Sequence, residues 1–403
     1  MPGKRTNGSL PSPKRMVYYH IAEQGVVSKA QLLDRFSLTS STMTRLLEEM
    51  VREGLIRVSG LGPSSGGRRP ILYEMNPGFA YFFGLEISRF HSSLGLFDAC
   101  MNPLSFTRWR MDETMTPLRL IDHVAGQMKA FLHDHGIGPR QVAGVGVGAV
   151  GPLDRERGMI LRPLRFPAQG WTNVPICQMI GERTGFPARL ENGANTALMA
   201  EHWAMRRRNP QHMLYVHAGV GLRSAMMSYG RIIHGSVDME GAVGQMIIQT
   251  DGPRLEEGGN FGAWEAFASI QALERQARAQ AKMGRIDGMA SFGVPPDRIR
   301  YDDLLEALRR DDPFAEELFR QAACHFGIGL ANLINVLHPE IVILGGALIN
   351  SDDRFFETAI GIARKNIYYF PEYEPVFTKG ELREDAVATG AALMAWKEMP
   401  HRW

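Results

Sequence analysis

A strand-turn-strand unit occurs twice in this sequence, and each copy begins its own stretch of alternating strand and helix patterns. The first copy predicts strands over Phe82–Ile87 and Ser92–Asp98, and the second over Leu214–His217 and Ser224–Ser228. Glycines occupy the turn of the second copy, where they let backbone N–H groups approach an anion. The repeat predicts a duplicated α/β architecture in which two lobes enclose a cleft.

The first 76 residues carry a different pattern, in which apolar residues recur at helical spacing. Three helices are predicted, the last of them capped by Thr39, over Lys14–Gly25, Ser28–Phe36 and Ser40–Glu53. Two helices joined by a three-residue turn are typical of a helix-turn-helix. We expect the third helix to present to DNA the side chains of Ser41, Thr42, Thr44 and Arg45.

A predicted hairpin follows these helices. Gly54–Val58 is the first strand, Ser59–Gly67 is a loop rich in Gly and Ser, and Arg68–Glu74 returns as the second strand. Such a wing would place Arg68 and Arg69 beside a duplex, for phosphate or minor-groove contact. Residues 1–76 carry 11 basic and 6 acidic side chains, which favours a polyanionic partner. A role of this module in protein–protein contact stays open as the alternative.

Length and composition limit the remaining classes. A chain of 403 residues predicts two or three folding units, and 44% hydrophobic with 22% charged residues is ordinary for a globular protein. The N-terminus lacks the apolar core of a signal peptide, and the most apolar stretch, Gly327–Ile349, is interrupted by polar residues, so we expect no membrane segment. Three distant cysteines predict no disulfide framework and a reducing cytoplasm.

Six segments, in order along the chain, together resemble the ROK family of repressors and sugar kinases, and within it the repressors of the NagC, Mlc and XylR type. These segments are LTSSTMTR at 38–45, SSGGRRP at 64–70, GVGVGAVGP at 144–152, GWTNVP at 170–175, ENGANTA at 191–197 and LANLINVLHPEIVILGG at 330–346. The resemblance implies an actin-like, ribonuclease-H-like two-lobed α/β domain after a winged helix-turn-helix. The implied units are a basic tail at 1–13, the DNA-binding module at 14–76, one lobe at 77–197 with a C-terminal helix at about 382–400, and a second lobe at 198–381.

Three positions of the family's kinase chemistry differ here. The family's first phosphate turn reads Asp-x-Gly-Gly-Thr, whereas Glu86–Phe90 lacks the glycines and carries two large side chains. The second turn lacks its hydroxyl in Ala218–Gly221, and Gly193 stands where the family has a catalytic aspartate. Loss of a general base alone lowers a rate by about 10²–10⁴. We therefore expect no enzymatic activity and no catalytic residues.

The zinc loop of the family has also lost its ligands. Its cysteines are absent from the run 256–265, and Gln245 replaces the histidine that precedes them. Tetrahedral zinc sites are built from Cys thiolates and His nitrogens. The sequence therefore predicts no metal site and no cofactor.

Part of the family's sugar site is retained, because the resemblance assigns effector contacts to Trp171, Asn173, Asn192, Gln245 and Glu265. Amides and carboxylates suit vicinal hydroxyls because each group can make two hydrogen bonds. Gly193 and Ala242 are smaller than the acids of the family, so we expect a roomier, less acidic cleft. A bulkier or anionic effector, such as a substituted or phosphorylated sugar, would suit it. A cleft that binds nothing and serves only dimerisation remains an alternative.

These features together predict a regulator of a carbohydrate uptake or catabolism operon. A homodimer or homotetramer would bind double-stranded operator DNA, and a carbohydrate effector in the cleft would release it. Two other readings remain open. One is a sugar kinase with an appended DNA-binding module, and the other is a regulator controlled by a protein partner.

Overall fold

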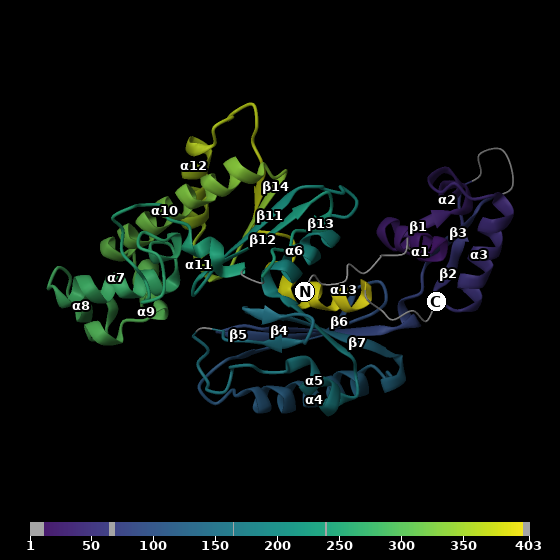
Figure 1. Cartoon of the computed structure of the whole chain (residues 1–403), viewed down its shortest axis with the longest axis horizontal. Coiled ribbons are helices and arrows are strands. Elements are labelled where there is room, and N and C mark those ends of the chain that lie inside the picture. The colour runs from purple at the N-terminus through teal and green to yellow at the C-terminus, as the bar shows by residue number, and fades with distance from the viewer. Residues whose placement is uncertain (1–11, 64–68, 164, 238–239, 398–403) are drawn as a thin grey trace, which may run out of the picture.

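A computed structural model describes residues 12–63, 69–163, 165–237 and 240–397 (Figure 1). Two five-stranded sheets form the body of the molecule, and a smaller three-stranded sheet belongs to an N-terminal module at one side. Most of the predicted basic tail and the predicted wing residue Arg68 lie outside the described residues. No helix of the described ranges is both long and apolar enough to span a membrane.

The N-terminal module contains the three predicted helices. Ser28 and Thr39 accept backbone hydrogen bonds as the caps of the second and third helices, which confirms the predicted Thr39 cap. A short strand that the sequence pattern missed pairs with the returning strand of the hairpin. The elements are α1 (Pro13–Gln24), β1 (Val26–Ser28), α2 (Lys29–Arg35), α3 (Ser40–Arg52), β2 (Ile56–Leu61) and β3 (Ile71–Met75). Their sheet is antiparallel in the order β1-β3-β2.

The first lobe is built on a mixed sheet in the order β10-β7-β4-β5-β6. Its strands are β4 (Tyr81–Ile87), β5 (His91–Phe97), β6 (Pro103–Arg110), β7 (Val142–Ala149) and β10 (Ala188–Asn192). One face is covered by α4 (Pro117–Asp134) and α5 (Ile176–Thr184), which lie below the sheet in Figure 1. Smaller elements are η1 (Pro77–Phe79), η2 (Pro139–Gln141) and the hairpin of β8 (Leu153–Asp154) and β9 (Met159–Ile160).

The second lobe repeats this topology, with the sheet order β13-β12-β11-β14-β15. In both lobes an antiparallel hairpin pairs through its first strand with a later parallel strand, so the predicted duplication is confirmed. The strands are β11 (Met213–Ala218), β12 (Leu222–Ser228), β13 (Arg231–Ile232), β14 (Ile341–Gly345) and β15 (Val376–Thr378). The α-helices of this lobe are α7 (Ile270–Lys282), α8 (Gly288–Phe292), α9 (Tyr301–Arg309), α10 (Pro313–Leu337), α11 (Ala347–Ser351) and α12 (Asp353–Asn366). Short 3-10 turns are η3 (Glu240–Gln245), η4 (Trp264–Ala266), η5 (Pro296–Arg298) and η6 (Arg383–Asp385).

Two helices, α6 (Gly193–Ala204) and α13 (Ala386–Lys397), form a layer between the two sheets (Figure 1). α13 lies against β4 and β7 so closely that a Cβ on Gly84 or Gly146 would stand 1.9 or 1.7 Å from a backbone oxygen of α13. α6 packs on the strands of the second lobe through Ala197 and Leu198. The predicted lobe boundary between residues 197 and 198 falls inside α6.

An aromatic cluster joins the N-terminal module to this middle layer. We use that name for Tyr18 and Tyr19 of α1, Trp203 of α6 and Trp396 of α13. The Trp396 ring lies 6.0, 5.1 and 5.3 Å from the rings of Tyr18, Tyr19 and Trp203, measured between centroids. The Tyr19 hydroxyl and the Arg15 guanidinium both donate to the backbone oxygen of Lys397 at 2.9 Å. The first and last described helices therefore share one core.

Candidate functional site

Two cavities lie where the lobes meet. The first, here called the polar cavity, has a volume of about 450 Å³ and is lined in part by Arg155, Asn192, Asn195, His234 and Met246. The second, the basic cavity, has a volume of about 300 Å³ and is lined in part by Glu86, Arg89, Arg108, His217 and Arg223. The two predicted phosphate turns contribute to the basic cavity and not to the polar one.

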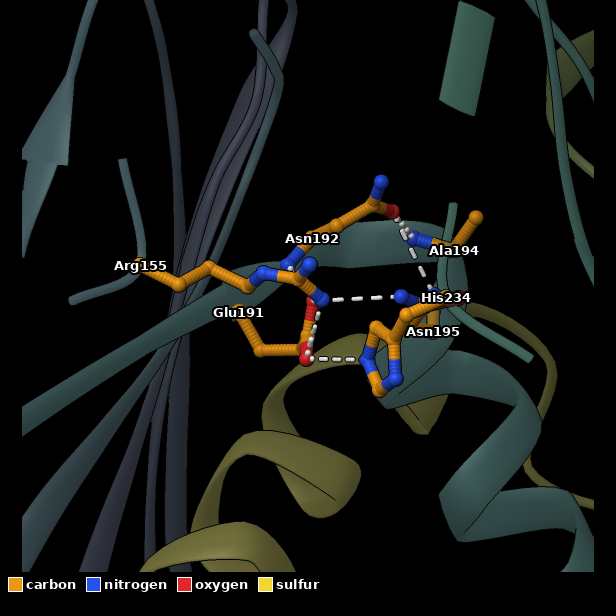
Figure 2. A network of polar contacts seen from close by, with 6 residues as sticks. All are labelled: Arg155, Glu191, Asn192, Ala194, Asn195 and His234. Carbon is orange, nitrogen blue, oxygen red and sulfur yellow. Dashed lines mark hydrogen bonds and ion pairs between the residues drawn. The ribbon is translucent and has the colours of Figure 1, made fainter. Parts of the chain in front are cut away.

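A buried carboxylate organises the wall of the polar cavity (Figure 2). Glu191 ends β10 with an exposed fraction of 8%. Its two oxygens accept from Asn195 Nδ2 at 3.1 Å and lie 3.0 Å from His234 Nε2. Arg155 Nη1 lies 3.4 Å from both oxygens. Because three side chains from separate segments converge on it, Glu191 fixes the relative positions of β10, α6 and the loop after β13.

Asn192, a predicted effector contact, both lines this cavity and caps α6. Its Oδ1 accepts from the backbone nitrogens of Ala194 at 2.8 Å and Asn195 at 3.3 Å. An N-cap amide satisfies helix N–H groups that would otherwise lack partners. The capping oxygen is therefore fixed toward the helix, and the assignment of Asn192 to effector binding stays a prediction.

Gln245 and Glu265, the next two predicted contacts, are brought together. Gln245 Nε2 donates to Glu265 Oε1 at 2.6 Å, and burial raises the pKa of Glu265. The Glu265 carboxylate lies under two glycines, since a Cβ on Gly221 or Gly244 would be 3.0 or 2.9 Å from its Oε2. The Glu265 carboxylate therefore packs against the turn between β11 and β12 and against η3, where Gly221 and Gly244 leave room for it.

Trp171 and Asn173 lie apart from these groups. The Trp171 ring is buried in the core of the first lobe, 4.6 Å from the Phe166 ring between centroids, and its Nε1 donates to the backbone oxygen of Met115 at 3.1 Å. Asn173 is exposed and has a φ of 55°. Packing accounts for Trp171 without a ligand, so its effector contact stays a prediction that this geometry does not favour.

The region aligned with the zinc loop is held by amide contacts. Gln245 Oε1 accepts from the backbone nitrogen of Asn260 at 2.7 Å, and Asn260 Nδ2 donates to the backbone oxygen of Gln245 at 2.9 Å. Within the described ranges, no group of three His, Cys, Asp or Glu side chains is arranged to hold a metal ion. The donors at this position therefore suit hydrogen bonding rather than zinc.

Glu86 stands in the basic cavity at the end of β4. Its Oε2 accepts from Ser93 Oγ at 2.9 Å. Burial raises the pKa of Glu86 to about 7, although Ser93, Arg108 and Arg223 oppose the shift. A carboxyl with that pKa is close to half protonated at neutral pH.

Replacing Glu86 with glutamine is expected to remove a pH dependence of stability. The folded pKa of about 7 exceeds the ordinary value of 4.5, so this carboxyl contributes stability that is complete below pH 4.5 and is lost as pH rises through 7. From pH 5 to pH 8 the wild type should lose about 2 kcal/mol of unfolding free energy relative to Glu86→Gln. Urea unfolding of both proteins across this range measures the difference, and parallel profiles would contradict it.

The predicted DNA-facing residues of α3 lie in its first turns. Ser41 and Arg45 are exposed, while Thr42 is half-buried. The hydroxyls of Ser41 and Thr42 lie 3.1 and 2.8 Å from the capping hydroxyl of Thr39. These two hydroxyls therefore belong to the cap network. Among the predicted DNA-facing residues of α3, Arg45 is the exposed one with a long side chain that can donate hydrogen bonds.

Thr44 and Arg69 are held by neighbouring groups. Lys29 Nζ donates to Thr44 Oγ1 at 2.5 Å, and that hydroxyl donates to the backbone oxygen of Ser40 at 2.9 Å. Arg69 is exposed, but its Nε donates to the backbone oxygen of Gly62 at 3.0 Å. The guanidinium of Arg69 is thereby positioned against the end of β2.

Several residues of the two cavities were not predicted from the sequence. Glu191 opens the motif at 191–197, so its position alone could have indicated a role. Arg155 and His234 contact it from 36 and 43 residues away, and no local pattern marks either residue. Arg223 follows a recognised turn, but only the folded cavity reveals its surroundings.

Comparison with known proteins agrees with this architecture. The chain is similar to the xylose repressor of Caldicellulosiruptor bescii, with 24% identity over 390 residues that cover 96% of both chains. The crystal structure of a ROK family transcriptional regulator, a homologue of the Escherichia coli Mlc protein, matches with a TM-score of 0.74 and 19% identity, covering 95% of this chain and 96% of the other.

A kinase of similar fold matches a smaller share of the chain. The ROK hexokinase of Thermus thermophilus has a TM-score of 0.62 and 29% identity, covering 79% of this chain and 98% of its own. The model of the ROK family matches residues 83–398, which include both lobes and the middle layer. The expected two-lobed α/β fold is therefore confirmed, and this chain belongs to the ROK family.

Proposed function

We propose that this protein is a DNA-binding transcriptional repressor of carbohydrate genes, released from its operator by a carbohydrate effector bound between the lobes. The observation that carries the proposal is the N-terminal module, in which α2, α3 and the β2–β3 hairpin have the order of a winged helix-turn-helix. The similarity to a xylose repressor over 96% of both chains, module included, supports it. A homodimer or homotetramer would place two such modules on a palindromic operator.

The geometry of the basic cavity supports a regulator rather than a sugar kinase. Arg89 and Phe90 stand in the first turn, where a kinase needs close backbone approach to phosphate. At the position of the family's catalytic aspartate, Gly193 leaves the first turn of α6 without a general base. A coupled assay of sugar-dependent ATP hydrolysis should detect no turnover. Turnover that Glu265→Ala abolishes would favour the kinase alternative.

The middle layer offers a physical connection between effector and DNA. α6 begins at the Asn192 cap in the polar cavity and carries Trp203 near its other end, in the aromatic cluster that contacts α1. A change in lobe closure that moves α6 would therefore also move the aromatic cluster against which the N-terminal module packs. Such coupling requires that the effector bind the two arrangements with different affinities.

Replacing Arg45 with alanine is expected to weaken operator binding about 10- to 100-fold, because an arginine on a recognition helix contributes about 1–3 kcal/mol. Operator sequences would first be selected from random DNA with the full chain. Affinity would then be measured at several salt concentrations, since loss of a phosphate contact would also lower the salt slope by about 1.

The matched control is Arg309→Ala, whose side chain is 71% exposed on the second lobe. This control should bind the operator as the wild type does. Selection that yields no operator, or equal affinity of Arg45→Ala and Arg309→Ala, would contradict the assignment of α3 as the recognition helix.

A further inference from the structure

In the part of the chain that the structure describes, two connections join the second lobe to the middle layer of α6 and α13. The first is the segment 205–212, between α6 and β11, and the second is the segment 379–385, between β15 and α13. Each contains a non-glycine residue of positive φ, Asn209 at 48° in the first and Arg383 at 50° in the second. Residues in connections and at element ends absorb the backbone rotations of domain hinges. Any rotation of the second lobe relative to α6 and α13 therefore has to be taken up by these two connections.

A buried carboxylate on α6 holds the second connection at its middle. Glu201 is 1% exposed, and its Oε2 and Oε1 accept from the backbone nitrogens of Glu381 at 2.8 Å and Leu382 at 3.0 Å. Gly380, with a φ of 81°, leaves room for the carboxylate, since a Cβ there would be 2.7 Å from Glu201 Cδ. Burying a carboxylate is unfavourable unless hydrogen bonds replace its hydration. The carboxylate and the two N–H groups therefore stabilise one another, and we call this contact the Glu201 clamp.

The two sides of the clamp are tied to different lobes. Before it, Lys379 Nζ donates to Asp353 Oδ1 of α12, in the second lobe, at 2.5 Å. After it, the Arg108 guanidinium of β6, in the first lobe, donates to Glu384 and, at 2.9 Å, to Asp385. Both outer contacts are partly exposed ion pairs, which are individually weak, whereas the clamp is buried. The chain thus passes from one lobe to the other at the clamp.

We propose that residues 379–385 form a hinge between the lobes, that the Glu201 clamp is its pivot, and that rotation at this hinge regulates operator binding. The polar cavity is lined from both sides of the hinge, by Asn192 at the start of α6 and by Ser224 and Met226 of β12. A ligand that contacts both sides binds best at one angle between them. The regulatory part of this inference rests on the proposed function.

Glu201→Gln tests the clamp by amide hydrogen exchange of the full chain. Glutamine keeps the size of the side chain but replaces one acceptor oxygen with a donor NH₂ group. The amides of Glu381 and Leu382 should exchange about 10- to 100-fold faster, because a hydrogen bond to a charged group is worth that factor. Gly380→Ala, which places a methyl group against the carboxylate, should give the same pattern, while the amides of β4 and β14 stay protected in both variants. Glu357→Gln, on the exposed side of α12, is the control. Unchanged exchange in Glu201→Gln would overturn the clamp.

The distance between the lobes tests the hinge itself. Spin labels would be attached to Leu118→Cys of α4 and Val336→Cys of α10, positions that are 71% and 78% exposed, in a chain whose native cysteines are replaced by serine. We expect one narrow distance distribution, which Glu201→Gln broadens and Glu357→Gln does not. Faster exchange of the hinge amides together with an unchanged distance distribution would show that the clamp is an anchor only, and would overturn the hinge.

Operator DNA selected from random sequence with the full chain tests the regulatory part. Glu201→Gln should bind this DNA about 2- to 30-fold more weakly than the wild type, because fewer molecules have the lobe arrangement that the operator selects. Adding the operator should then narrow the label distances of Glu201→Gln. Equal operator affinity of Glu201→Gln and the wild type would overturn regulation by this hinge and leave the repressor function intact. Failure to select any operator, alongside a broadened distance distribution in Glu201→Gln, would instead contradict the proposed function and not the hinge.

Discussion

Gly146→Ala is expected to lower the unfolding free energy by about 3 kcal/mol or more, because overpacking against a backbone cannot be relieved by a change of rotamer. A Cβ at this position in β7 would stand 1.7 Å from the backbone oxygen of Ala391 and 2.3 Å from its carbonyl carbon. Relief would require α13 to move away from the sheet. Since Gly390 of α13 is itself packed against the backbone of Thr196, that movement would also disturb α6. Urea unfolding and the yield of folded protein measure the effect.

Gly126→Ala provides the matched control. Gly126 lies in α4, and a Cβ there would meet no atom within 4 Å. The same change of glycine to alanine should therefore be neutral or stabilising by about 0.5–1 kcal/mol. If both variants have the same unfolding free energy as the wild type, the backbone of α13 does not pack against Gly146 of β7 as described.

Trp396→Ala is expected to have the second large effect, a loss of about 3–5 kcal/mol for removal of a buried tryptophan. Trp396 is 1% exposed and contacts both α1 and α6 through the aromatic cluster. The cavity left behind would weaken the packing of the N-terminal module against α6 and α13. Limited proteolysis should then cut between this module and the first lobe, and the effector should lose its influence on operator affinity. Thermal unfolding gives the change in stability.

Tyr368→Ala is the control for loss of an aromatic ring. Its side chain is 83% exposed, so its removal should change stability by less than about 0.5 kcal/mol. Trp396→Phe keeps a ring in the cluster, so its loss of stability should lie between those of Trp396→Ala and Tyr368→Ala. Unchanged coupling of effector and operator in Trp396→Ala would show that the aromatic cluster does not connect them.

Local features of the fold were predictable from the sequence. The three N-terminal helices follow from apolar spacing and from the caps Ser28 and Thr39, which act within three residues of their partners. The strands of the duplicated hairpins follow from buried runs that end at turns, and their ends differ from expectation by few residues. The strand β1 was missed because three residues are too short to show an alternating pattern.

Long-range features were not predictable in the same way. No local pattern explains the glycines at 84 and 146, and only the folded chain shows that a helix more than 200 residues later packs where their side chains would be. In the site, Asn192 was found through a motif, whereas the partners of Glu191 come from loops with no pattern of their own. Val51, at an apolar helical position, is exposed because the apolar face of α3 is wider than its contact with the module core.

The aromatic cluster also has a consequence for the order of events during synthesis. The hydroxyl of Tyr19 and the carbonyl that accepts its hydrogen bond are separated by 378 residues. At about 5–20 residues per second, roughly 20–80 s pass between translation of α1 and translation of its partner helix. Throughout that interval the apolar face of α1 cannot meet α13, which makes the nascent N-terminal module a candidate client for chaperones until the last helix emerges.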